Sequence, residues 1–358
     1  IGNSSGYNSV GGFNNVFIGF ETGYSNINSF DNVFLGNRSG YTNTYGNSNV
    51  FVGNHSGYNN TTGDDNVFMG FKSGFNNTTG RENVFIGWLA GESNESSVGN
   101  TFIGSVAGNK TIDGYNNTFI GLHAGEANIS GYENTIIGAW AADNDTLGNR
   151  NTVIGMGAAR QVIGFQNVII GTRAGENKST GNNNVIIGDW SGHDSQGSGN
   201  VFLGTGSGYN NNGDKNVFIG NEAGANDTGS NKLYISNWNA DSTQSLIYGN
   251  FHDYDLRFNA NVGIGGNPDT DYNLTISPQS NGADIKLYGT DDGFNYGSIV
   301  LVAKNTPVEN IWQINHSSDN HKYKLVSYDA SGWNVNLELD TTGNMLLNRG
   351  GLTLNGNL

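Results

Sequence analysis

The hydrophobic positions of this chain fall into a short phrase, such as NVFLG at Asn32 to Gly36, that recurs along most of its length. The phrase places three consecutive apolar residues between an asparagine and a glycine. Because successive side chains on a β-strand point to opposite faces, such a run puts apolar side chains on both faces. The pattern therefore predicts a short strand that needs cover on two sides.

The closing glycine of the phrase sets a regular repeat. The sequence numbers of ten such glycines, from Gly2 to Gly155, increase by 17 at all nine steps. Four more follow at steps of 16, 17, 16 and 16, namely Gly171, Gly188, Gly204 and Gly220. A fixed period of this kind is typical of solenoids in which one repeat forms one coil. We therefore expect an all-β fold, a β-solenoid (β-roll) of about fourteen coils of 16–17 residues.

The columns of the aligned repeat indicate how one coil is built. The residue four before the closing glycine is asparagine, as at Asn32 and Asn216, which predicts a ladder of side-chain amides from coil to coil. A second glycine four residues after the first suits a corner with a positive φ. The Val/Thr and Ile/Leu columns lie two residues apart and share one face. We expect these two columns, for example Val33 and Leu35, to fill the interior of the chain.

The column between them then faces outward, and it is apolar in thirteen repeats. It consists of Phe17, Phe34, Phe51, Phe68, Phe85, Phe102, Phe119, Ile136, Val153, Ile169, Ile186, Phe202 and Phe218. At ~150 Å² or more per phenylalanine, this column exceeds the ~300–600 Å² of apolar patch usual on a monomer. We therefore expect these residues to form an inter-chain seam in a homotrimer. Exchanging the two faces leaves this conclusion unchanged, because one apolar face still needs cover.

Two local departures from the repeat suggest binding surfaces, each with a plainer alternative. Tyr7, Tyr24, Tyr41 and Tyr58 occupy one column and could contact glycan rings, but we favour the alternative that they stack on each other and cover the corner of the coil. Four neighbouring copies replace phenylalanine by isoleucine or valine, close to Trp140 and Trp190. For these copies we favour a local repacking of the seam over a binding site.

The pattern changes after the repeats, which we assign to residues 1–229. Residues 230–280 are expected to form a capping coil and a β neck, and residues 281–342 a small antiparallel β domain. Residues 343–358 return to short glycine-punctuated strands and begin a further fibre segment. The pattern starts in mid-repeat and ends in mid-pattern, so we expect the chain to be a piece of a longer fibre.

Composition and charge limit the classes of partner that we expect for this chain. The chain has 56 glycines among 358 residues, only 13% charged residues, no cysteine and a formal net charge of −15. An acidic chain disfavours nucleic acid and anionic membrane surfaces as partners, and no run reaches the ~18 apolar residues of a membrane span. We therefore expect neither nucleic-acid binding nor membrane insertion in this segment.

The candidate chemistry is sparse. His316 and His321 lie near each other in a polar stretch, and the acidic pairs Asp64-Asp65 and Asp291-Asp292 are interpreted as solvated turns, with a weakly held Ca²⁺ as the alternative. No nucleophile motif or phosphate-binding glycine loop occurs. We expect no catalytic residue, no metal site and no cofactor.

The phrase N-[VT]-F-I-G-x-x-[AS]-G resembles the head repeats of trimeric autotransporter adhesins and the repeat regions of phage tail fibres, over about residues 1–229. The resemblance implies a homotrimer in which each chain forms a β-roll around a common axis. The repeat of this chain is longer than is usual in adhesin heads, so the loop of each coil must be larger.

The function expected from this resemblance is a non-enzymatic, extracellular fibre on a virion tail or a bacterial cell surface, which presents an attachment surface to a host receptor or glycan. The alternative is a tailspike-type polysaccharide depolymerase. Such enzymes are also β-solenoids, but nine consecutive steps of equal length leave no insertion that could build a catalytic groove.

Overall fold

The computed structural model describes residues 1–144, 148–161, 164–177 and 181–264, together with strands within 274–347. The chain divides into two compact units, made mainly of Ile1–Val262 and of Leu274–Leu358. All regular elements of the described residues are strands, and no helix long and apolar enough to cross a membrane occurs among them. The predicted all-β class is confirmed.

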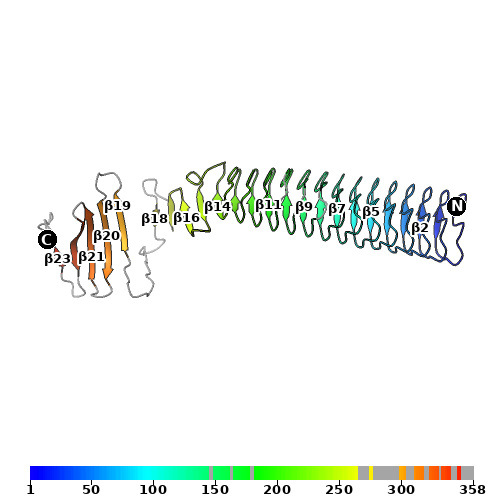
Figure 1. The fold of residues 1–358 in the computed structure, drawn as a ribbon, viewed down its shortest axis with the longest axis horizontal. Helices are drawn as coiled ribbons and strands as arrows, with labels where there is room; N and C mark the ends of the chain where they lie inside the picture. The colour runs from blue at the N-terminus through cyan, green and yellow to red at the C-terminus, as the bar shows by residue number, and fades with distance from the viewer. Residues whose placement is uncertain are drawn as a thin grey trace. The chain divides into compact units, whose positions relative to one another are not determined.

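The first unit is a stack of parallel strands in sequence order, each joined to the next by a loop that completes one coil (Figure 1). Thirteen strands have three residues each: β1 (Val16–Ile18), β2 (Val33–Leu35), β3 (Val50–Val52), β4 (Val67–Met69), β5 (Val84–Ile86), β6 (Thr101–Ile103), β7 (Thr118–Ile120), β8 (Thr135–Ile137), β9 (Thr152–Ile154), β10 (Val168–Ile170), β11 (Val185–Ile187), β12 (Val201–Leu203) and β13 (Val217–Ile219). They enclose about twelve full coils, fewer than the fourteen expected, because the repeat closing at Gly2 has no strand and thirteen strands leave twelve intervals between them.

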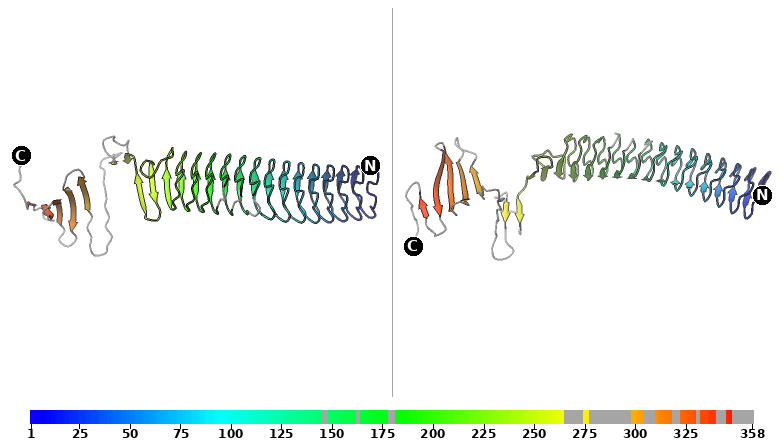
Figure 2. Two further views of the ribbon diagram at one scale, coloured as in Figure 1. Left: turned by 45° about the horizontal axis from the view of Figure 1, so that its top comes forward. Right: turned by 60° about the horizontal axis from the view of Figure 1, so that its bottom comes forward.

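The strands pair in the register that the repeat predicts, with equivalent columns side by side. Val16 pairs with Val33 and Phe17 with Phe34, and the same holds down the stack. Figure 2 shows that the stack bends gently along its length. Because of this register, equivalent residues of successive coils form ladders at the spacing of neighbouring strands.

The parallel stack ends at β14 (Lys232–Ile235), which still pairs with β13. The chain then reverses into β15 (Ile247–Asn250) and β16 (Asp255–Phe258), which continue the same sheet in antiparallel fashion. Buried Tyr234 of β14 donates a hydrogen bond to Asp227 Oδ2 at 2.7 Å and packs edge-on against Phe218, which closes the interior at this end.

The remaining strands form two further sheets, and the larger of the two is antiparallel throughout. β17 (Val262–Ile264) and β18 (Leu274–Ile276) form a two-stranded sheet. The second unit contains one sheet of five strands in sequence order: β19 (Ser298–Ala303), β20 (Asn310–Ser317), β21 (Lys322–Asp329), β22 (Gly332–Leu339) and β23 (Met345–Leu347). The antiparallel strands expected here are therefore present. The exact bounds assigned from the sequence to a neck, a β domain and a further fibre segment stay predictions.

The interior of the solenoid is filled by the phenylalanine column, not by the columns on either side of it. Phe34, Phe51 and Phe68 are 0% exposed within the single chain, whereas Val33 and Leu35 are 38% and 42% exposed. Neighbouring rings stack at 4.8–4.9 Å between centroids from Phe34 to Phe119. The middle residue of each strand therefore points inward and its two neighbours point outward.

This arrangement corrects the expected seam. Residues buried inside one chain cannot contact a second chain, so the assignment to an inter-chain seam is wrong for Phe17, Phe34, Phe51, Phe68, Phe85, Phe102, Phe119, Ile136, Val153, Ile169, Ile186, Phe202 and Phe218. Phe17 is only partly buried, but it packs against the same interior cluster. The physical reason is the corner glycine, which leaves room for a ring: a Cβ on Gly40 would lie 2.5 Å from Phe34 Cδ2.

The asparagine ladder predicted from the sequence is confirmed. Asn66 donates from Nδ2 to the Gly80 carbonyl at 2.8 Å, and its own Oδ1 accepts the Asn83 backbone N–H at 3.1 Å. A second buried ladder, seven residues after the closing glycine, was not expected: Asn77 donates to Asn60 Oδ1 at 2.7 Å. The first ladder satisfies backbone and side-chain polar groups that would otherwise be costly to bury. The second is incomplete, since the buried Oδ1 atoms of Asn77 and Asn94 have no hydrogen-bond partner.

Candidate attachment surfaces

The outward-facing columns of β1–β13 form one surface, which we call the strand face. It contains two residues from each strand, and most are apolar, such as Val16, Ile18 and Leu203, which are 47%, 39% and 45% exposed. Summed over all thirteen strands, the strand face exposes on the order of 1,000 Å², above the ~300–600 Å² usual for the largest apolar patch of a monomer. The strand therefore remains apolar on both faces, as expected, with the roles of the faces exchanged.

A different surface runs along the first corner of the coils. We call it the corner edge and define it by the residues two and five positions after each closing glycine. Non-glycine residues in the first of these columns adopt positive φ in coil after coil, for example Arg38 at 51°, Leu89 at 55° and Trp140 at 55°. Each coil therefore presents its corner side chains in the same direction, which makes them neighbours along the edge.

The tyrosines predicted to contact glycans lie together on the corner edge. Tyr7, Tyr24, Tyr41 and Tyr58 stack with centroids 5.0–5.1 Å apart and planes within 11° of parallel, and Phe75 continues the stack. The stacking expected under the plainer alternative is present. Glycan contact by these residues stays a prediction.

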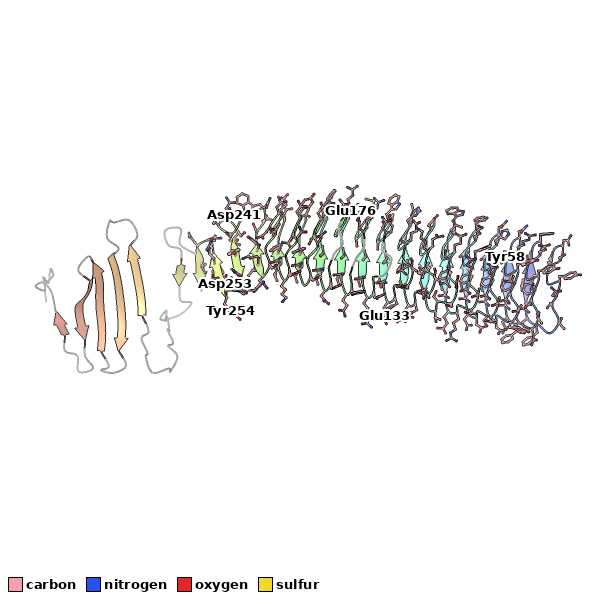
Figure 3. The ribbon with its side chains drawn as sticks, viewed as in Figure 1. Tyr58, Glu133, Glu176, Asp241, Asp253 and Tyr254 are labelled. Carbon is pink, nitrogen blue, oxygen red and sulfur yellow. The ribbon has the colours of Figure 1, made fainter. Side chains whose placement is uncertain are left out.

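Further along the corner edge the aromatic column gives way to paired charges. Arg160 contacts Asp143 at 3.3 Å (Nε–Oδ2) and Glu176 at 4.0 Å (Nη1–Oε1), and Arg173 contacts Glu176 at 3.6 Å. His193, 3% exposed, lies 3.8 Å from Glu176 Oε2. Figure 3 shows Glu176 at the upper edge of the solenoid and Glu133, which pairs with Arg150, at the lower edge. The acidic side chains of this stretch are thus held in ion pairs.

Burial and ion pairing shift the pKa of the Asp143 carboxyl in opposite directions. Desolvation raises the pKa of the Asp143 carboxyl above its ordinary value, and the neighbouring Glu126 adds to this, whereas Arg160 lowers it. Desolvation is the largest of these effects. Sequence reasoning missed this cluster, although the signal was present: Asp143, Arg160, Glu176 and His193 occupy the same column as the four tyrosines.

Two cavities open on the corner edge beside glycines. One, of about 320 Å³, is lined by Trp140, Met156, Gly157, Arg160, Arg173 and Glu176. The other, of about 410 Å³, is lined by Trp190, Thr205, Gly206, Tyr209, Glu222, Ala225, Asn226 and Asn239. The two tryptophans noted in the sequence each line one cavity.

The described residues offer little for metal binding or catalysis. No group of three or more His, Cys, Asp or Glu side chains placed to hold a metal ion occurs within them. Of the Asp64-Asp65 pair, Asp65 is exposed, whereas Asp64 Oδ1 accepts the Asn47 backbone N–H at 2.7 Å. His321 and the pair Asp291-Asp292 lie outside the described residues.

The solenoid thus exposes a long apolar strand face and a corner edge that carries aromatic and charged side chains. Comparisons of the chain with models of protein families, with curated proteins and with solved structures found no match.

Proposed function

We propose that this chain is a segment of a structural, adhesive extracellular fibre, assembled as a homotrimer, that presents an attachment surface to a host receptor or glycan on a virion tail or a bacterial cell surface. The observation that carries the proposal is the strand face, an apolar surface that runs along the whole parallel stack without cover from the described part of the chain.

The geometry of the strand face favours a second copy of the chain as the group that covers it. Its side chains repeat once per coil, at the strand spacing of ~4.7–4.9 Å. A partner that packs along its length must repeat with the same period, and another copy of this solenoid has that period. The area of the strand face, on the order of 1,000 Å², is comparable with the ~800 Å² per partner of a standard stable interface. That the assembly contains three copies of the chain is inferred from the resemblance to trimeric adhesin heads and tail fibres.

The charged groups fit a binding surface better than glycoside hydrolysis. A glycosidase needs two carboxyl groups free to act on the scissile bond. On the corner edge, Asp143 and Glu176 are paired with arginines. A non-enzymatic role is therefore the better supported proposal.

Light scattering on the full chain tests the assembly. With a chain mass of 38.1 kDa, three copies give about 114 kDa. Val84→Asp places a charge in the middle of the strand face, where Val84 is partly exposed, and is expected to reduce the mass to that of one chain. Thr62→Asp, on an exposed loop of a neighbouring coil, is the matched control and should leave the mass unchanged. A wild-type mass of one chain would contradict the homotrimer.

A further inference from the structure

The corner edge lacks a side chain at two places, Gly157 and Gly206. Both occupy the column two residues after the closing glycine, where other coils carry large side chains such as Leu89, Trp140 and Arg173. The backbone does not distinguish these two sites, since φ is 64° at Gly157 and 55° at Leu89 and Trp140. Glycine is therefore not required there by a conformation peculiar to these coils.

Packing does not require glycine at Gly157 either. A Cβ at this position would lie 3.6 Å from Arg173 Cγ and 3.9 Å from Glu176 Oε1, both ordinary contacts. At Gly206 the nearest atom would be Glu222 Cγ at 3.2 Å, part of an exposed, flexible side chain. By contrast, a Cβ on the corner residue Gly74 would lie 2.5 Å from the buried ring of Phe68. A side chain would thus fit at Gly157 as the structure stands, and at Gly206 after a small shift of the Glu222 side chain.

The space beside each glycine is a notch with similar walls, and it corresponds to one of the two cavities described above. At the Gly157 notch, Trp140 stands one coil before and Arg173 one coil after. At the Gly206 notch, Trp190 stands one coil before and Glu222 one coil after. A tryptophan on one side and a charged side chain on the other recur at both notches, although the coils differ in their interiors.

We propose that the two notches bind pyranose rings of a neutral polysaccharide. Consecutive stacked rings on the corner edge are 5.0 Å apart. The walls of a notch stand two coils apart and are therefore separated by roughly 10 Å, twice the spacing of neighbouring strands. A ring in place of the missing side chain would lie about one coil spacing from each wall, as Tyr41 lies between Tyr24 and Tyr58.

The chemistry of the walls selects a sugar over a purely apolar ring. Tryptophan offers a large apolar face with one polar edge, which suits the C–H face of a pyranose. The hydroxyl groups around that ring can bond to Glu176 and Arg173 in one notch and to Thr205, Asn226 and Glu222 in the other. In the first notch Arg160 and Arg173 are already paired with Glu176, so a neutral ligand fits it better than a charged one.

The two notches can act together on one chain of sugars. They lie three coils apart, which is roughly 15 Å at the spacing of neighbouring strands. A monosaccharide fills one notch, whereas a sufficiently long oligosaccharide can span both and gain affinity through the high effective concentration of its second end. This inference rests on the proposed attachment role, whose ligand class and site it names.

Tryptophan fluorescence of the full chain provides the test, because Trp140 and Trp190 line the notches. The probes are gluco-, galacto-, manno- and N-acetylglucosamine oligomers from one to six units. We expect a saturable change with at least one series and an affinity that rises with oligomer length. Gly157→Leu with Gly206→Leu, which fills both notches, is expected to weaken binding at least ten-fold. The double variant Trp140→Ala/Trp190→Ala, followed by calorimetry, should also weaken it.

The same column supplies the matched control, Val106→Leu, which enlarges a side chain where no notch exists and should leave binding unchanged. No binding by any series, or equal binding by the wild type and both double variants, would overturn the inference. Light scattering on the same samples separates the two proposals: a trimer mass without sugar binding overturns the notches alone, whereas a single-chain mass with sugar binding overturns the trimer alone.

Discussion

Two groups of coils in the same solenoid fill their interiors with different side chains. The coils of β1–β7, β12 and β13 place phenylalanine in the interior, whereas those of β8–β11 place Ile136, Val153, Ile169 and Ile186 there. The corner changes in two of the four aliphatic coils: Ala142 and Ala159 follow Ile136 and Val153, whereas the other two keep Gly175 and Gly192, as the phenylalanine coils keep Gly40 and its equivalents.

In the two alanine coils the interior residue and the corner residue change together, which indicates a coupled pair there. A Cβ at the corner of a phenylalanine coil would lie inside van der Waals contact with the ring. Ala142 and Ala159 are 0% exposed and have φ of 45° and 48°, so each accepts a backbone that favours glycine and fills space that the smaller interior side chain leaves. In these two coils the corner methyl thus restores part of the volume lost from the interior, as close packing favours.

The largest expected effect is the loss of an interior ring. Phe68→Ala removes a ring stacked on both sides, at 4.9 Å from Phe51 and from Phe85, and should cost about 3–5 kcal/mol. Ile169→Ala in an aliphatic coil should cost less, nearer ~2–3 kcal/mol. Hydrogen exchange read coil by coil measures the free energy of local opening. Equal costs at both positions would mean that ring stacking adds nothing to aliphatic packing.

The asparagine ladder should not distinguish the two groups, because it runs through both. Asn66→Leu and Asn167→Leu each remove the acceptor of a backbone N–H and the donor to a glycine carbonyl. We expect a similar cost at the two sites, about 1–3 kcal/mol for each group left unsatisfied. The midpoint of urea unfolding would report it. A much smaller cost at Asn167 would show that the aliphatic coils are held differently.

The coupled pair itself is tested by a double-mutant cycle. Gly74→Ala alone should overpack the Phe68 ring and cost about 1–3 kcal/mol. In a chain that also carries Phe68→Ile, the same change should cost less, with a coupling of ~0.5–3 kcal/mol. Ala142→Gly is the reciprocal variant, and relief of its positive φ should make it neutral or slightly stabilising. If the costs of the two single changes simply add in the double variant, the corner and interior residues are not coupled, and this explanation of the difference between the two groups of coils is wrong.

Sequence reasoning reached the coil, its period, its register and one asparagine ladder, because these follow from spacing alone. It reversed the faces of the strand, since Val33, Phe34 and Leu35 are all apolar and hydrophobicity does not say which face is inside. The size of Phe34 and the glycine at position 40 held the missing information. A Cβ on Gly40 would lie 2.5 Å from Phe34 Cδ2, so the large interior side chain and the glycine corner belong together in this coil.

The corner edge was harder to predict than the fold. The four tyrosines were visible as a column of one residue type, but the ion pairs around Glu176 and the notches at Gly157 and Gly206 are changes of residue type within a column. The significance of the notches depends on the direction in which the neighbouring side chains point, which the positive φ of the column two residues after the closing glycine determines.

The smallest expected effect is a dependence of stability on pH, which arises from Asp143 in one of the aliphatic coils. Because burial raises the pKa of Asp143 in the folded chain, folding favours its protonated form. Its contribution to stability is therefore greatest below the ordinary aspartate range and declines as pH rises through that range to the folded pKa. Asp143→Asn, which can still accept from Arg160, should thus be slightly more stable than the wild type at pH 7, within ~1 kcal/mol.

Asp241 is a control whose carboxyl pKa is shifted in the opposite direction from that of Asp143. Hydrogen bonds from Thr243, the side chain first and then the backbone, lower the pKa of its carboxyl, so its contribution is present above the ordinary aspartate range and is lost on acidification. Urea midpoints measured between pH 3 and pH 7 should therefore show the advantage of Asp143→Asn shrinking on acidification, while any cost of Asp241→Asn also shrinks. An advantage of Asp143→Asn that grows toward low pH would show that the Arg160 pair outweighs burial at this corner.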